Sequence, residues 1–133
     1  MFGKVIMDKA LALLSINVMM IMFFLAGVDK VRNFNKVVKG FITRAPITPV
    51  WLASICITIA IIIELVGPVM INYGFFKKDK AMYLIGCVSL IIFTVLATLI
   101  YHFPPTGFRY YPFMSNLTTI GGLMLASTFH TVV

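Results

Sequence analysis

The sequence predicts an all-α fold, an integral membrane four-helix bundle with a short amphipathic interfacial helix between the first and second spans. Of the 133 residues, 61% are hydrophobic and 11% are charged, which is too apolar for a water-soluble protein and short enough for one domain, residues 1–133. The apolar residues form four long runs, not the short alternating strands of a membrane barrel. The basic residues lie almost wholly at the ends of these runs, where membrane proteins keep them.

The net charge of +7 raises the question of a nucleic-acid partner. Basic residues at the ends of apolar runs instead contact anionic headgroups or extend their stems to the membrane interface. We therefore expect a lipid bilayer, and no nucleic acid, as a partner of the chain. The composition does not indicate which membrane holds it.

The first predicted span covers residues 10–28. It is about 19 residues long and lacks a small-x-small cleavage pattern before the charges resume, so we expect a membrane helix and not a cleaved signal peptide. Asn17 is its most polar interior residue. Such a residue most often makes an interhelical hydrogen bond, and a contact to a ligand is the alternative.

A basic segment, residues 29–48, follows the first span. Its apolar residues between Val31 and Ile42 recur at helical spacing, which puts them on one face with the basic residues largely opposite. This pattern predicts a short helix in the headgroup plane, and a solvated basic loop is the alternative. Membrane-surface or partner docking is assigned to the basic residues of this segment and of a later loop: Lys30, Arg32, Lys36, Lys39, Arg44 and Arg109.

The second predicted span, residues 50–74, carries one carboxylate, Glu64, near its centre. An ionised side chain at that depth costs at least a few kcal/mol, so Glu64 should be protonated, paired or turned into the interior of a bundle. We expect Glu64 to point inward and to contact a polar group from another helix. Candidates for that group are Asn17, Thr98 and Asn116.

The third and fourth predicted spans cover residues 81–103 and 113–130. On the third, Cys87, Thr94, Thr98 and His102 recur at spacings of seven, four and four, which predicts one polar stripe facing other helices. Threonines on such a stripe usually bond the carbonyl of the preceding turn, and a ligand or proton path is the alternative.

Two cysteines, Cys56 and Cys87, fall on neighbouring antiparallel spans. Their distances from the shared turn differ by about 18 Å along the helices. A disulfide tolerates a Cα separation of about 7 Å at most, so we expect both thiols to be free.

Three short motifs occur in a characteristic order. Ala26-Gly27-Val28-Asp29-Lys30 closes the first span, Ile63-Glu64-Leu65-Val66-Gly67 lies in the second, and Tyr73-Gly74-Phe75 stands at the following turn. Together with His102 and Gly121-Gly122, they cover most of the chain. In this order they resemble the DoxX family of small four-helix membrane proteins.

Some members of that family are associated with membrane redox chemistry, as quinone-linked oxidoreductase subunits or as partners of thiol and superoxide enzymes. The resemblance implies a redox-linked or small-molecule-binding membrane subunit. It also implies a shared polar site lined by Glu64 and His102, to which Asn116 is added for its depth. The full candidate set for a ligand-binding or polar site in the bundle is Glu64, His102, Asn116, Asn17 and Thr98.

No enzyme motif occurs independently of the resemblance. The chain has no Cys-x-x-Cys pair, glycine-rich phosphate loop, metal-binding cluster or paired carboxylates. The sequence therefore identifies no catalytic residue, metal or cofactor. The histidines His102 and His130 stand near helix ends, where an interfacial position explains them better than haem ligation. The competing function is a structural membrane component with protein partners, which docks a larger assembly such as a soluble complex or a viral shell on its bilayer.

Overall fold

The computed structural model describes the backbone of residues 2–103 and 105–128, with side chains from residue 8 onward. These residues are almost entirely helical, and no strand occurs among them. The elements in chain order are α1 (Phe2–Arg32), α2 (Phe34–Arg44), α3 (Val50–Lys77), α4 (Lys80–Tyr101), the short 3₁₀ helix η1 (Gly107–Arg109) and α5 (Tyr110–Ser127).

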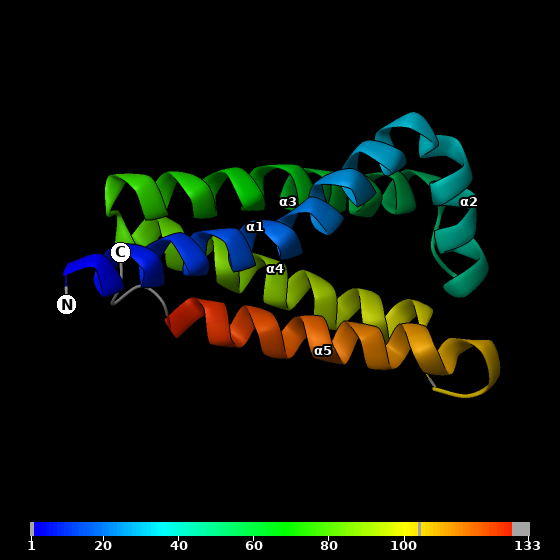
Figure 1. The fold of residues 1–133 in the computed structure, drawn as a ribbon. Helices are drawn as coiled ribbons and strands as arrows, with labels where there is room; N and C mark the ends of the chain where they lie inside the picture. The colour runs from blue at the N-terminus through cyan, green and yellow to red at the C-terminus, as the bar shows by residue number, and fades with distance from the viewer. Residues whose placement is uncertain (1, 104, 129–133) are drawn as a thin grey trace.

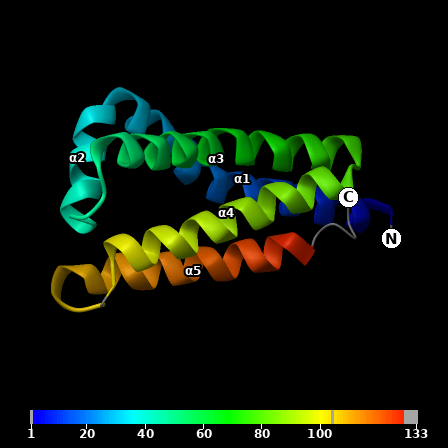
Figure 2. The same cartoon turned by 180° about the vertical axis from the view of Figure 1, so that it is seen from behind.

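The four longer helices α1, α3, α4 and α5 run roughly along one axis and alternate in direction (Figure 1). The short helix α2 crosses this axis at one end of the molecule, the same end at which α4 connects to α5 (Figure 2). The turn between α3 and α4 lies at the opposite end, beside the start of α1. The molecule therefore has an α2 end and an α3–α4 turn end.

Three of the described helices are long and apolar enough to cross a membrane, at Asp8–Arg32, Val50–Lys77 and Lys80–Tyr101. Large apolar side chains on their outward faces are exposed, as lipid contact requires. The helix α5, which corresponds to the fourth expected span, is not among the three. It begins at Tyr110 with polar residues, and residues 129 and 130 of the expected span lie outside the described part. The all-α membrane class is confirmed, whereas a four-helix membrane bundle stays a prediction.

The helix α1 continues past the expected end at residue 28 and stops at Arg32. The backbone N–H of Asn33 still bonds the carbonyl of Asp29, so the charged residues at the end of α1 belong to the helix. The segment expected at the interface consequently begins only at Phe34. Val31, expected on its apolar face, instead lies exposed in the last turn of α1.

The turn between α3 and α4 consists of two residues. Lys78 ends α3 in the left-handed region with φ of 55°, and the side chain of Asp79 accepts a hydrogen bond from the Met82 N–H to cap α4. Two glycines let the helices approach closely behind this turn. A Cβ at Gly74 would stand 2.6 Å from the Tyr83 backbone nitrogen, and one at Gly86 would stand 3.1 Å from the Gly67 carbonyl oxygen.

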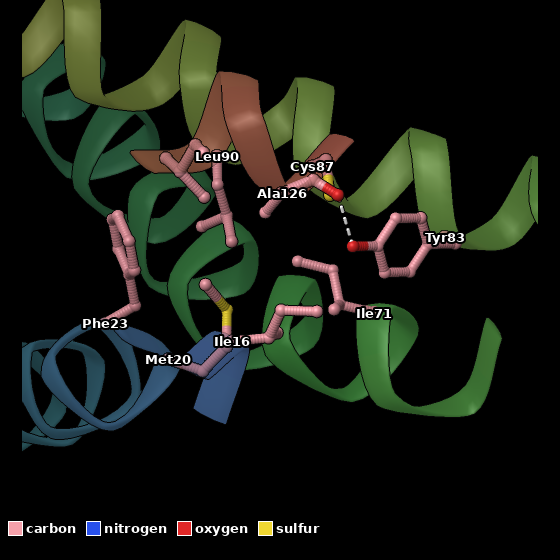
Figure 3. Packing of buried hydrophobic residues seen from close by; sticks show 9 residues of the cluster. Ile16, Met20, Phe23, Ile71, Tyr83, Cys87, Leu90 and Ala126 are labelled. Atoms are coloured by element: carbon pink, nitrogen blue, oxygen red, sulfur yellow. Dashed lines mark hydrogen bonds between the residues drawn. The ribbon is translucent and has the colours of Figure 1, made fainter. Parts of the chain in front are cut away.

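The main apolar cluster occupies the half of the molecule toward the α3–α4 turn end, where α1, α3, α4 and α5 meet (Figure 3). The Tyr83 hydroxyl is buried there and donates to the Ala126 carbonyl, which joins α4 to α5. Cys87, Thr94 and Thr98 are buried too, so these three members of the predicted stripe face other helices. The fourth member, His102, follows the end of α4 and is half-buried. The fully or nearly buried members of the cluster are Ile16, Met20, Phe23, Ile71, Tyr83, Cys87, Leu90, Leu123 and Ala126.

A second, smaller apolar cluster attaches α2 to α3. Val38 of α2 packs with Ala53 and Ile57 of α3, and half-buried side chains from the same face of α2 surround them. Lys36 and Lys39 of α2 are exposed. Neither apolar cluster fills the middle of the molecule beside α3.

Candidate functional site

The centre of α3 holds an ion pair with α1. Lys30 Nζ lies 2.6 Å from Glu64 Oε1, and the two side chains are 24% and 1% exposed. Apart from this ion pair, Oε1 has no hydrogen-bond partner among the described residues. The same ammonium lies 5.9 Å from the ring centroid of Phe93 on α4. Lys30 therefore connects three helices at one point.

Gly27 makes this pairing possible. A Cβ at Gly27 would stand 2.8 Å from Cδ2 of Leu65 and 3.2 Å from Cβ of Glu64, so α1 crosses α3 at almost the closest distance that side chains allow. Lys30 follows Gly27 by three residues and lies on the same face of α1. The small residue sets the crossing point, and the lysine one turn later meets the carboxylate.

Pro68, which is buried on α3, adds to the unmet hydrogen-bonding capacity around Glu64. In a helix the N–H of residue 68 would bond the carbonyl of residue 64, and proline has no N–H. The carbonyl of Glu64 therefore lacks its usual helical donor. Backbone and side chain of the same residue both carry acceptor atoms that can take a further donor.

A cavity of about 850 Å³ extends from this ion pair toward the α2 end. Five helices line it, and most of its walls are apolar. Phe23 belongs to the main apolar cluster and Ile57 to the smaller one, so the cavity lies between the two. The cavity borders the outer apolar surface, because several of its lining side chains are also exposed there. These are Met22, Ile59, Ile92 and Leu96.

The polar groups that line the cavity come from several helices. Near the α2 end they include Asn33, Lys36 and His102, and the deeper end carries Glu64 and Lys30. At the α2 end, Phe41 of α2 and Tyr101 of α4 pack edge to face with their ring centroids 6.4 Å apart, which connects α2 to α4 beside the cavity.

His102 stands just beyond the span that ends at Tyr101. Partial burial, followed by the positive charges of Arg44 and Arg109, holds the pKa of His102 below its usual value. The imidazole is accordingly neutral at pH 7 and offers one donor and one acceptor nitrogen.

Comparison with known proteins identifies the family. The DoxX family model matches residues 13–103, about two thirds of the chain. The chain belongs to the DoxX family. No curated protein and no solved structure matches it. The predicted resemblance is confirmed, and two of the motifs that suggested it, the one ending at Lys30 and the one around Glu64, meet in the ion pair.

The polar partner of Glu64 in this DoxX-family protein is not one of the three expected residues. Asn17 donates instead to Asn72 Oδ1 on α3 at 2.9 Å, so it makes the predicted interhelical hydrogen bond at another place. The hydroxyl of Thr98 donates to the Thr94 carbonyl, the ordinary arrangement of a helical threonine. Asn116 lines the cavity without contacting Glu64 through any hydrogen bond.

Lys30 is the site residue that sequence reasoning missed. The sequence places Lys30 among the basic residues of the membrane surface, because the first span is predicted to end before it. Its position three residues after Gly27, inside the motif of the family, is the signal that could have identified it. Of the other basic residues in that group, Lys36 also lines the cavity, whereas Arg32, Lys39, Arg44 and Arg109 do not.

The cysteines do not form a redox pair with each other. Both are free, with Cys87 buried in the main cluster and Cys56 half-buried beside the cavity. In the described part of the chain, no three His, Cys, Asp or Glu side chains gather closely enough to hold a metal ion. His130 lies outside the described residues.

Proposed function

We propose that this DoxX-family membrane protein binds a small, mostly apolar molecule in the cavity, as a redox-linked or small-molecule-binding subunit. The observation that carries the proposal is a nearly inaccessible carboxylate, Glu64, paired with Lys30 at the wall of a cavity of about 850 Å³. A buried charge pair is costly to maintain, and within a membrane such residues usually mark a functional site.

The size and lining of the cavity support a small molecule as its occupant. Ligand pockets typically measure about 300 to 1,000 Å³ and have apolar walls with a few polar groups that orient the ligand. Here the walls come from several helices and are mostly apolar, with a few polar groups that include Glu64, Lys30 and His102. The exposed apolar residues along the lining give a molecule dissolved in the bilayer a route to the cavity.

The membrane arrangement belongs to the same proposal. The helices α1, α3 and α4 span the bilayer, α5 packs against α4 as the fourth member of the bundle, and α2 lies in the headgroup plane. Support for the position of α2 comes from its sided burial, since Val38 packs on α3 while Lys36 and Lys39 are exposed. The cavity would then open near one membrane surface.

The test measures which molecule copurifies with the protein in mild detergent, by extraction and mass spectrometry. Gly40 lines the cavity, and a Cβ there meets no atom within 4 Å, so Gly40→Leu adds a bulky side chain at the cavity wall without a clash at Cβ. Gly121 also has no atom within 4 Å of an added Cβ, and it does not line the cavity, so Gly121→Leu is the matched control. We expect a bound molecule in the wild type and in Gly121→Leu, and little in Gly40→Leu.

Glu64→Gln tests the polar contact separately, because the isostere keeps the shape of the side chain and removes its charge. The variant should fold and should retain the molecule less well than the wild type. Equal recovery from the wild type and both glycine variants would contradict the proposal. The chemical identity of the recovered molecule shows whether the function is redox-linked.

The docking function remains as the alternative outcome. It predicts no specific bound molecule and a loss of association with a larger assembly when basic residues at the surface are changed. The residues to change are those that do not line the cavity: Arg32, Lys39, Arg44 and Arg109.

A further inference from the structure

We propose that the deep end of the cavity is an ammonium site, and that the ligand is a protonated amine with an apolar body that replaces Lys30 at Glu64. This inference rests on the proposed binding function and names the chemical class of the ligand. It starts from what surrounds the lysine ammonium, since that group already occupies the site.

The surroundings of Lys30 Nζ are those by which proteins recognise ammonium ions. A carboxylate oxygen of Glu64 lies at 2.6 Å, and the ring of Phe93 lies with its centroid at 5.9 Å. A carboxylate supplies charge pairing, and an aromatic face supplies cation–π attraction within about 6 Å. The carboxylate comes from α3 and the ring from α4, whereas the ammonium is supplied by α1. The site and the cation that fills it therefore belong to different helices.

The two partners differ in their freedom to leave. Glu64 is 1% exposed in the middle of α3, whereas Lys30 is 24% exposed at the last turn of α1 and ends a flexible four-carbon stem. Lys30 also lines the cavity, with Asp29 and Asn33 beside it toward the α2 end. The lysine can withdraw toward these polar groups while the carboxylate and the ring stay in place. A cation arriving through the cavity then meets a preformed site.

Charge conservation selects the ligand class. A neutral head that displaced Lys30 would leave the buried carboxylate without a countercharge, which is strongly unfavourable. An anionic head would add repulsion to that cost. An ammonium restores the pair that it breaks, so a cation alone can exchange with Lys30 at little electrostatic cost. The apolar walls of the cavity accommodate the remainder of the molecule.

The experiment compares three probes with the same twelve-carbon chain: N,N-dimethyldodecylamine, dodecanol and dodecanoate. Binding to the detergent-solubilised protein is measured by native mass spectrometry and by the shift in unfolding temperature, with Gly40→Leu defining binding outside the cavity. We expect the wild type and Gly121→Leu to bind the amine at least tenfold more tightly than dodecanol or dodecanoate. Glu64→Gln should lose this preference.

Lys30→Met tests the exchange itself. If the lysine occupies the site about 90% of the time, the amine pays about a tenfold reduction in apparent affinity, which the variant removes. Lys30→Met should therefore bind the amine about tenfold more tightly than the wild type does. An unchanged amine affinity in a folded Lys30→Met would overturn the exchange. Should this variant not fold, the preference for amine over dodecanol in the wild type and its loss in Glu64→Gln decide the question.

The outcomes separate this inference from the binding function on which it rests. If dodecanol or dodecanoate binds as well as the amine, and Gly40→Leu weakens their binding, the cavity binds ligands but the ammonium site is refuted. If Gly40→Leu changes neither probe binding nor the molecule that copurifies, the binding function itself fails.

Discussion

Removal of the Lys30 ammonium should destabilise the protein by an amount that depends on pH. Lys30→Met keeps most of the stem and leaves Glu64, 1% exposed, without its countercharge. Breaking a buried pair in this way typically costs about 3 to 5 kcal/mol. The carboxylate can escape part of that cost by taking up a proton. Protonating a glutamate with an ordinary pKa of about 4.3 costs roughly 3.7 kcal/mol at pH 7, which sets the upper limit of the loss.

The same limit falls to about 1 kcal/mol at pH 5, because each pH unit is worth about 1.36 kcal/mol. We therefore expect a loss of about 3 to 4 kcal/mol at pH 7 that shrinks by roughly 2 to 3 kcal/mol at pH 5. The assay is unfolding in mixed detergent micelles followed by circular dichroism, with wild type and variant compared at each pH. The matched control is Lys36→Met, which removes an exposed lysine from the same cavity and should change stability little at either pH. A loss that is equal at pH 5 and pH 7 would refute the reasoning.

Three further predictions concern other parts of the molecule. Gly74→Ala should cost at least about 1 to 3 kcal/mol in unfolding free energy, because the added Cβ stands 2.6 Å from a backbone nitrogen, while Gly121→Ala has open space and should gain up to about 1 kcal/mol. Replacing Lys36 and Lys39 with glutamate should weaken binding to anionic vesicles by about 1 kcal/mol or more per site, and unchanged binding at low salt would place α2 away from the headgroups. The pKa of His102 is lowered in the folded protein, so the unfolded chain takes up a proton first as the pH falls. The free energy of unfolding should therefore decrease below about pH 6.5, and His102→Gln should remove that decrease. Identical pH profiles of stability for the wild type and His102→Gln would contradict this prediction.

The inward position of Glu64 could be predicted from the sequence, but its partner could not. Depth along a helix follows directly from residue count, and a carboxylate near the middle of an apolar run has few tolerable places other than the interior. The partner depends on where α1 ends and on how far a lysine side chain reaches. The charged residues after position 28 predict the end of the first helix there. The helix instead continues to Arg32 and includes Lys30.

Asn17 shows the same division between residue type and partner. An asparagine inside an apolar span predicts an interhelical hydrogen bond, and this one exists. Its partner, Asn72, lies in the second predicted span, in which the sequence singles out only Glu64 as a polar site residue. Along the antiparallel helices, Asn17 precedes Lys30 by about 20 Å, and Asn72 follows Glu64 by about 12 Å. The Lys30 stem points back toward the start of α1, which helps to make up the difference between these two distances along the helices.

The cavity could not be predicted from the sequence. It exists because α1 and α2 diverge at Asn33, so that five helices surround a space that the two apolar clusters do not fill. Neither the direction of α2 nor the crossing of α1 over α3 at Gly27 follows from periodicity. The lining residues come from all five helices and share no common sequence pattern.

The hydrogen bond between Asn17 and Asn72 has a consequence for how the chain assembles in lipid. Apolar side chains lose little when they exchange a helix neighbour for an acyl chain, so apolar packing alone tolerates several alignments of α1 along α3. A slide by one turn, about 5.4 Å, would break both the Asn17–Asn72 bond and the Lys30–Glu64 pair. Each asparagine would keep its bond to a carbonyl of its own helix, but the buried Glu64 carboxylate would lose its countercharge in hydrocarbon. The two polar contacts lie in different turns of the same two helices, so a slide of α1 along α3 loses both together. The absence of water in the lipid therefore favours one register of α1 against α3, the one in which both polar contacts form.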